Sequence, residues 1–356
     1  MTGVFDESRL DDEEALALAD VVLRPMAEAG ARVRREAGGA AEAIEAAVSA
    51  AAGEARPRAV VAAGPDSRLL RAVLEPWCPV PFVAWPGPSL PGWAGSLDLV
   101  VVLAPEGSDS GTASAVAEAV RRGCQLVVAC PARSLVAEHA AGRHSTVLPA
   151  TSGETLAVAV VMLEFLERLD LGPATDPEAV AAALDEVAIS CSPYKDLSVN
   201  PAKMLAIAMA DSMPLVWGGS VLAARAARRV AESIRRTSGR AALAADAEHL
   251  LPVIAAATRR DVFADPFADP EAELVETATE RRPILVILDD GSADASVREQ
   301  RGRLVAAARE RDVRVETVAT DAANEVARYA ALLATGTFAA TYLGVGLDRV
   351  TQQGVR

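Results

Sequence analysis

The chain has almost no lysine, few aromatic residues and few of the side chains that commonly bind metals. Lys195 and Lys203 are the only lysines among its 35 cationic residues, so a mechanism that needs a lysine has very few candidates. Aromatic residues make up 4% of the 356 residues, and we therefore expect an aliphatic core. The 4 cysteines form no CxxC pair, and the 3 histidines have no partners at zinc-ligand spacing. We expect no structural metal, no disulfide scaffold and no cofactor.

The charge is unbalanced toward acids. The chain has 49 Asp and Glu against 35 Lys and Arg, which gives a net charge of -14. Because an acidic surface repels a phosphate backbone, we expect no nucleic acid partner. Residues 1–14 lack the basic start of a signal peptide, and the most apolar stretch, residues 156–163, is too short to span a bilayer. We therefore expect a folded cytoplasmic protein with no membrane contact.

Short aliphatic runs alternate with Ala-rich amphipathic segments, a pattern that favours parallel strands connected by helices. Helices at about residues 11–36 and 40–52 are expected before the first strand. The expected strands are residues 59–63, 80–84, 97–103, 126–129 and 146–148 in the first half, and 214–217, 284–288 and 313–319 in the second.

Residues 191–201 (CSPYKDLSVNP) lose this periodicity and have the composition of a linker. Residues 261–282 are acidic and contain several prolines, which predicts an exposed loop with a short helix. The sequence thus predicts an α/β protein with two doubly wound parallel-sheet domains. The first, with its leading helices, covers residues 1–195, and the second covers residues 196–356.

The turns that follow the strands are the candidate ligand sites, because ligands of doubly wound sheets bind beyond the carboxyl ends of the strands. Glycines with Ser or Thr at a helix N-terminus suit a phosphate group. The candidate substrate-binding residues are Gly64 and Ser67 after the first strand, Ser108, Ser110, Gly111 and Thr112 after the third, and Gly218, Gly219 and Ser220 after the first strand of the second half. Three acids, Asp66, Glu106 and Asp109, stand in these turns and would repel a phosphate.

Two alternatives accompany these candidates. Ser67, Ser110, Thr112 and Ser220 could equally be ordinary helix caps. Elsewhere in the chain, Glu248 and His249 are adjacent and could shuttle a proton, although neighbouring helix residues point about 100° apart. We take this pair as a weak catalytic candidate.

Three segments carry a resemblance to a known family. Residues 200–206 (NPAKMLA), 213–218 (MPLVWG) and 340–345 (ATYLGV) resemble the bifunctional phosphoglucose/phosphomannose isomerases, which consist of two sugar isomerase (SIS) domains. The resemblance implies two SIS-like domains, the second of the phosphoglucose/phosphomannose isomerase C-terminal type, in a homodimer. It also implies a sugar phosphate ligand and a metal-free aldose–ketose isomerisation.

The same resemblance implies that the catalytic groups are missing. The position of the family's base Glu is taken by Ala245, and its ring-opening His would fall near Asp261, in a segment without histidine. The family's C-terminal Lys would lie beyond Arg356. The family's Gly-Gly-Ser turn corresponds here to residues 64–67 (GPDS), so the phosphate motif has also diverged.

These observations leave three hypotheses. The first is a phosphosugar-binding SIS protein whose aldose–ketose isomerase activity is weak or lost. The second is an active glucose-6-phosphate/mannose-6-phosphate isomerase whose base has moved to Glu248, with His249 as ring opener. The third is a non-enzymatic structural or regulatory partner.

Overall fold

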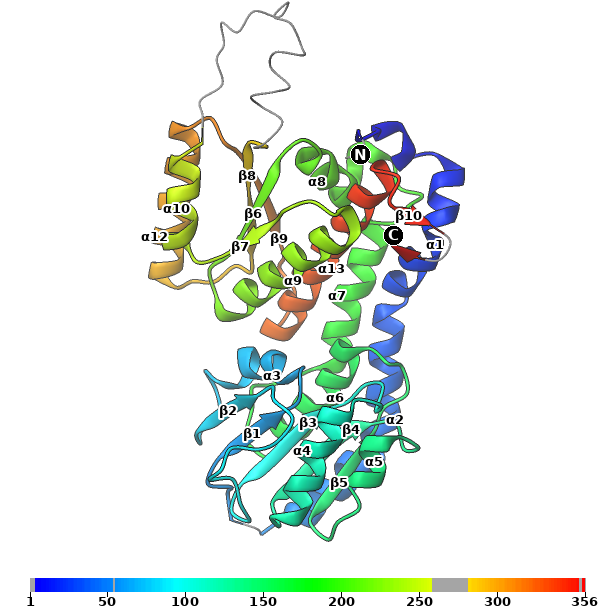
Figure 1. Ribbon diagram of the computed structural model, residues 1–356, viewed down its shortest axis with the longest axis vertical. Helices are drawn as coiled ribbons and strands as arrows, with labels where there is room; N and C mark the ends of the chain where they lie inside the picture. Colours follow the sequence, from blue (N-terminus) through cyan, green and yellow to red (C-terminus); the bar gives the residue numbers. More distant parts are fainter. Residues whose placement is uncertain (1–3, 54, 258–280, 352–353, 356) are drawn as a thin grey trace, which may run out of the picture. The chain divides into compact units, whose positions relative to one another are not determined.

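The computed structural model describes residues 4–53, 55–257, 281–351 and 354–355. It divides into two compact units (Figure 1). The N-terminal unit is Ala29–Asp185, and the C-terminal unit combines Met1–Glu28 with Glu186–Arg356. The first 28 residues thus make their contacts with the second half of the chain, whereas the sequence placed them with the first half. The boundary expected between residues 195 and 196 concerns family domains and stays a prediction.

The N-terminal unit is built on a parallel five-stranded sheet with the order β2-β1-β3-β4-β5. Its strands are β1 (Val60–Ala63), β2 (Phe82–Trp85), β3 (Leu99–Leu103), β4 (Gln125–Cys130) and β5 (Ser145–Pro149). All five residues of β3 are buried, because helices cover both faces of the sheet. The predicted parallel strands of the first half are confirmed within one or two residues at most ends.

The helices of this unit form the two outer layers. They are α2 (Ala29–Ala51), α3 (Ser67–Leu74), α4 (Ser110–Arg121), α5 (Leu135–His139), α6 (Thr155–Arg168) and most of α7 (Pro177–Ser190). Helices α4 and α5 pack on one face through aliphatic residues such as Val116 and Val136, whereas α2 and α6 cover the other (Figure 1).

The C-terminal unit contains a parallel four-stranded sheet with the order β7-β6-β8-β9. Its strands are β6 (Met213–Gly218), β7 (Leu243–Ala244), β8 (Pro283–Asp289) and β9 (Arg314–Ala319). Its helices are α1 (Glu13–Ala27), α8 (Pro201–Met209), α9 (Val221–Ser238), α10 (Ala247–Ala255), α12 (Ala295–Glu310) and α13 (Glu325–Gly346). Short 3-10 turns (Glu7–Leu10 and Leu197–Val199) and an antiparallel pair, β10 (Val350–Thr351) and β11 (Gly354–Val355), complete it. Helices α10 and α12 cover one face of the sheet, and α9 packs between the other face and α13 (Figure 1).

The fold class is confirmed, with two doubly wound parallel sheets, but some element boundaries differ from the predicted ones. The leading helices separate at Glu28, three residues after Pro25, and α2 continues through Gly38 and Gly39. The prediction of a break at those glycines was wrong, because a glycine weakens a helix by only about 1 kcal/mol and α2 is held by its packing on α6. The predicted loop at residues 261–282 falls almost entirely outside the described residues.

The segment expected to be a linker is an ordered part of the C-terminal unit. Asn200 is fully buried: its Oδ1 accepts the N–H groups of Ala202 and Lys203 at 3.1 Å, and its Nδ2 donates to the Ser192 carbonyl at 2.9 Å. The side chain of Lys203 is also fully buried, and its Nζ donates to Asp11 Oδ1 at 2.6 Å. The polar residues of this segment therefore fix its conformation, although their composition suggested a flexible connection.

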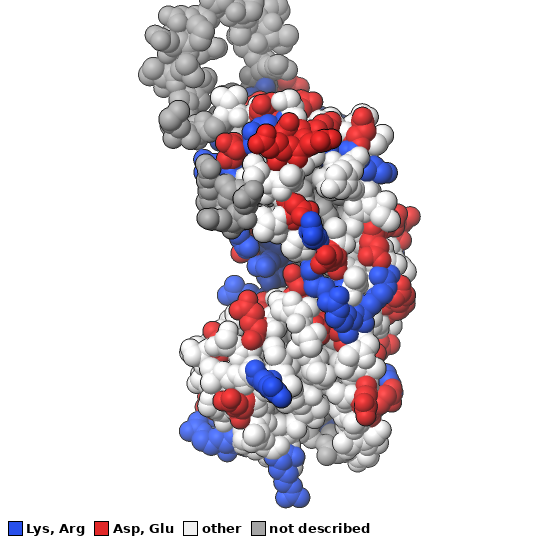
Figure 2. Space-filling view, turned by 90° about the vertical axis from the view of Figure 1, so that its right-hand side faces the viewer, with Lys and Arg blue, Asp and Glu red and all other residues white. Residues whose placement is uncertain are grey.

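None of the helices in the described part of the chain combines the length and the hydropathy that a membrane span requires. Acidic and basic side chains both occur on the face of the molecule in Figure 2, where the N-terminal unit, in the lower part of the view, presents mostly uncharged side chains. Cys124 and Cys130 are buried thiols, and burial raises the pKa of both.

Candidate functional site

The turns after β1 and β3 come together at the carboxyl edge of the N-terminal sheet. Gly64 has a φ of 90°, which favours glycine, and a Cβ at this position would lie 3.2 Å from Thr112 Oγ1. Gly111 precedes Thr112 at the start of α4, and Ser67 is the first residue of α3. The structure thus places four of the predicted binding residues, Gly64, Ser67, Gly111 and Thr112, in two adjoining turns.

Ser67 is the candidate donor whose hydroxyl has no hydrogen-bond partner among the described residues. The residue is buried, at 1% exposed. A buried hydroxyl in a native fold is nearly always paired, so an unpaired one requires an explanation, such as a ligand or a water molecule. Ser67 is not the cap of α3, since that position belongs to Asp66.

The N-terminus of α4 is already occupied by a carboxylate of the chain itself. Asp109 is the N-cap, and its Oδ2 accepts both the N–H and the hydroxyl of Thr112 at 2.6 Å. These hydrogen bonds, with another from the Gly111 N–H, hold the pKa of Asp109 below its ordinary value. The alternative that Ser110 or Thr112 caps this helix was therefore wrong, because the cap lies one residue before Ser110.

Ser108 and Ser110 lie on the same turn but face solvent. The turn is fixed by Gly107, whose φ is 68° and where a Cβ would lie 2.4 Å from that of Ser134. Both serines therefore face solvent, and neither forms a hydrogen bond with the Ser67 hydroxyl in the described part of the chain.

A buried carboxylate that the sequence did not indicate occupies the turn after β5. Glu36, on α2, is 1% exposed. Its carboxylate accepts the Thr151 N–H at 2.8 Å, the Thr151 hydroxyl at 3.0 Å and the Ser152 N–H. Glu36 therefore uses the donors that this turn could otherwise offer to an anion.

Replacing Glu36 with glutamine should destabilise the protein. The three donors converge on Oε1, which Glu36→Gln can keep, but the amide group that replaces Oε2 would face the Thr151 N–H, which lies 3.0 Å from Oε2. The loss of that acceptor in a buried site should cost about 1–3 kcal/mol. Equilibrium urea unfolding measures the loss. An unchanged midpoint would show that these hydrogen bonds do not hold the turn.

The turn after β6 in the C-terminal unit is shaped by packing. A Cβ on Gly218 would lie 2.2 Å from the Ala223 carbonyl carbon, and one on Gly219 would lie 2.3 Å from Val297 Cγ1. Ser220 caps α9 by accepting the Ala223 N–H at 3.0 Å, and its hydroxyl donates to Asp290. The capping alternative is confirmed for Ser220, and a carboxylate again stands where an anion would bind.

Glu248 and His249 lie in the first turn of α10, and both are exposed. Arg303 Nη1 lies 2.6 Å from Glu248 Oε1, and this hydrogen bond lowers the pKa of Glu248. Ala245, at the family's base position, lies just before α10, and Asp261 lies outside the described residues. Within the described ranges, no group of three or more His, Cys, Asp or Glu residues could hold a metal ion.

The two parallel sheets with their flanking helices match the architecture of tandem SIS domains. Residues 198–349 match the family of the bacterial phospho-glucose isomerase C-terminal SIS domain, so this part of the chain is a domain of that family. The resemblance found in the sequence is thereby confirmed. No curated protein matches the chain in sequence.

Solved structures share the fold over almost the whole chain. Tagatose-6-phosphate ketose/aldose isomerase from Escherichia coli aligns with a TM-score of 0.65 and 12% identity, covering 91% of this chain and 94% of that one. A glucose-6-phosphate isomerase-like protein from Thermus thermophilus gives a TM-score of 0.51, 18% identity and 96% and 94% coverage. The C-terminal domain of glucosamine-fructose-6-phosphate aminotransferase from Francisella tularensis gives 0.57, 9% identity and 90% and 98% coverage. At these identities the likeness extends to the fold alone.

Proposed function

We propose that the chain is a phosphosugar-binding SIS protein whose isomerase activity is weak or lost. The observation that carries this proposal is Asp109, whose carboxylate holds the N–H and hydroxyl donors of Thr112. A phosphate at this helix N-terminus must compete with a charge that is part of the protein. Sugar phosphate binding is therefore weak, and the protein lacks the acid and base groups that would isomerise the bound sugar.

The arrangement of acids and bases supports the loss of catalysis. An aldose–ketose isomerisation needs a base with a pKa near the working pH, placed against the substrate carbon. Glu248 is exposed and paired with Arg303, and its lowered pKa makes it a poor proton acceptor. At the position of the family's base, Ala245 has no group that can accept a proton.

The contacts around Ser67 support weak binding rather than none. Its buried hydroxyl has no partner among the described residues, and Thr112 Oγ1 lies across from Gly64 in the adjoining turn. Ser67 offers a hydroxyl donor and Gly64 a close backbone approach, which are features that phosphate groups use. The phosphate would still have to displace Asp109 from the Thr112 N–H.

A thermal-shift titration tests this binding. Glucose 6-phosphate, mannose 6-phosphate and fructose 6-phosphate should each raise the melting temperature only at millimolar excess, because a ligand stabilises in proportion to the logarithm of its excess over Kd. Glucose and inorganic phosphate serve as controls. A shift that is equal for phosphate alone, or absent for every sugar phosphate, would contradict the proposal.

The variant Glu248→Gln tests the alternative of a relocated base. If Glu248 is only an exposed partner of Arg303, its replacement should leave both the urea midpoint and any residual turnover almost unchanged, because exposed ion pairs contribute little to stability. Turnover and urea unfolding are measured on the same preparation. A drop in turnover of about 100-fold or more, typical for a lost general base, would revive the active-isomerase hypothesis.

A second candidate function is that of a structural or regulatory partner without a small ligand. Internal carboxylates favour it, since Asp109, Glu36 and Asp290 each accept donors in turns that could serve an anion. The same titration separates the two candidates, because the partner function predicts no stabilisation by any sugar phosphate.

We also propose that the protein is cytoplasmic and that it forms a homodimer, the assembly that the resemblance implies. Multi-angle light scattering at micromolar concentration should then give twice the chain mass. A monomer at that concentration would refute this assembly.

A further inference from the structure

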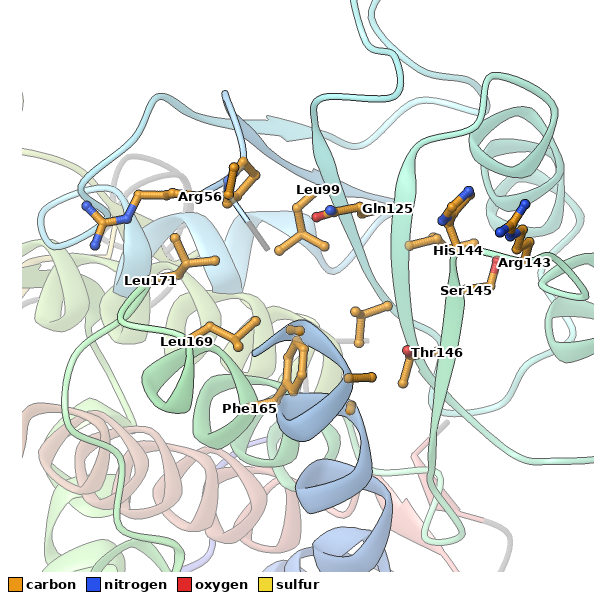
Figure 3. Close-up of a pocket in the computed structure, with 17 residues that line it drawn as sticks. Arg56, Leu99, Gln125, Arg143, His144, Ser145, Thr146, Phe165, Leu169 and Leu171 are labelled. Carbon is orange, nitrogen blue, oxygen red and sulfur yellow. The ribbon is translucent and has the colours of Figure 1, made fainter. Parts of the chain in front are cut away.

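A pocket opens at the amino edge of the N-terminal sheet, opposite the turns described above. It lies where β3, β4 and β5 begin and where α2 and α6 end (Figure 3). Its volume of about 550 Å³ lies within the range of roughly 300–1,000 Å³ that small-molecule sites occupy. All of its lining residues belong to the N-terminal unit.

Part of the pocket lining is apolar. Ala50 and Ala55 are exposed and Pro57 and Leu169 are half-buried, whereas Leu99, Leu126, Phe165 and Leu171 are each 4% exposed or less. Leu171, Leu169 and Phe165 follow one another on one side of the view, across from Ser145 and Thr146 of β5 (Figure 3). A ligand that replaces water over the exposed apolar side chains gains the free energy of covering apolar surface, about 25 cal/mol per Å².

The rim carries cations and hydrogen-bonding groups. Arg143 and His144 lie at one end of the pocket and Arg56 at the other (Figure 3). All three are exposed. Gln125, Ser145 and Thr146 add polar groups between these ends.

The charge of this rim contrasts with the rest of the chain. Among the residues that the structure describes, no Asp or Glu lines the pocket, in a protein of net charge -14. Arg56 and Arg143 form no ion pair within the described residues, whereas Arg168 nearby pairs with Glu45 at 2.6 Å. The rim therefore carries a local positive charge beside exposed apolar side chains, and such a charge attracts anions.

We propose that this pocket binds a small organic anion with an apolar body, such as a medium-chain or aromatic carboxylate. The apolar body covers Pro57, Leu169 and the neighbouring alanines, and the carboxylate accepts hydrogen bonds from Arg143 at the rim. The site is separate from the carboxyl-edge turns, so the proposal is independent of sugar phosphate binding.

Isothermal titration with octanoate and with octylamine tests the charge preference, since the two differ mainly in the sign of their head group. Octanoate should bind to the full-length protein with a 1:1 stoichiometry, and octylamine at least about tenfold more weakly, a difference of about 1.4 kcal/mol. Equal affinities, tighter binding of octylamine or no binding of octanoate would overturn the proposal.

Variants then locate the site. Arg143→Glu reverses a rim charge, and Ala50→Trp places a large side chain in the pocket from an exposed position on α2. Each should weaken octanoate binding by about tenfold or more, the equivalent of one lost charge-assisted hydrogen bond or of a filled pocket. Arg309→Glu, an exposed position on α12, makes the same charge change as Arg143→Glu and should alter the affinity less than about twofold. If Arg309→Glu weakens binding as much as Arg143→Glu does, or if Ala50→Trp has no effect, the pocket is not the site.

Discussion

Replacing Asp109 with serine should raise the affinity for glucose 6-phosphate by about tenfold or more. Unit charges about 4 Å apart repel by several kcal/mol near a protein surface, and Asp109→Ser removes that repulsion at the N-terminus of α4. Serine remains a good N-cap, so the helix should keep its start. The affinity is measured by thermal-shift titration and by ligand-observed NMR.

Two further variants make this result specific. Asp12→Ser, at the N-cap of α1, changes the same residue type in the same role away from the site, and should leave the affinity unchanged. Adding Ser67→Ala to Asp109→Ser should remove most of the gain, because the buried hydroxyl of Ser67 is the donor without a partner among the described residues. An affinity that does not rise with Asp109→Ser would contradict the proposed place of phosphate binding.

Lowering the pH to 5 should not raise the affinity of the wild-type protein for glucose 6-phosphate in the way that Asp109→Ser does. The pKa of Asp109 is held below its ordinary value of about 3.9, so its carboxylate stays charged at pH 5 and above. The difference in affinity between Asp109→Ser and the wild-type protein should therefore be the same at pH 5 as at neutral pH.

Replacing Lys203 with methionine should destabilise the C-terminal unit by about 3 kcal/mol. The Lys203 side chain is fully buried, and its Nζ donates to Asp11 and to the carbonyls of Pro193 at 2.9 Å and Lys195 at 3.0 Å. It also lies 5.8 Å from the centre of the Tyr342 ring. Lys203→Met leaves these acceptors without their donor, which is the costly way to break a buried ion pair. Urea unfolding followed by circular dichroism measures the loss.

The only other lysine is the matched control. Lys195 is exposed, and the hydrogen bond that Lys203 forms with it uses the backbone carbonyl. Lys195→Met should therefore shift stability by less than about 0.5 kcal/mol. Similar losses in both variants would show that Lys203 does not hold the unit together. Lys203 is thus a buried residue that stabilises the fold, and Lys195 is a surface residue. Neither has the surroundings of a catalytic cation.

The sheets could be predicted because each strand is a short aliphatic run that is buried by its neighbours. Leu99–Leu103 and Pro283–Asp289 carry this signal within their own residues. The same holds for the turns, since the glycines and serines after each strand are local features.

Residues that act over long sequence distances could not be predicted in this way. Glu36 lies 115 positions from Thr151, and nothing near either residue indicates that they meet. The segment before α1 belongs to the C-terminal unit because Arg9 donates to the Val345 carbonyl at 2.9 Å and Gly346 leaves room for Phe5. The amino-edge pocket was missed for another reason. The rule that ligands bind at the carboxyl ends of strands directs attention away from Arg143 and the other strand starts.

The most direct test of the central claim is the turnover of the purified wild-type chain with glucose 6-phosphate, fructose 6-phosphate and mannose 6-phosphate. We expect less than about 0.1 s⁻¹ for each interconversion, because the loss of a general base removes at least about 100-fold from an ordinary turnover of about 10 s⁻¹. A turnover of about 1 s⁻¹ or faster, within the ordinary range of enzymes, would contradict the conclusion that isomerase chemistry is weak or lost.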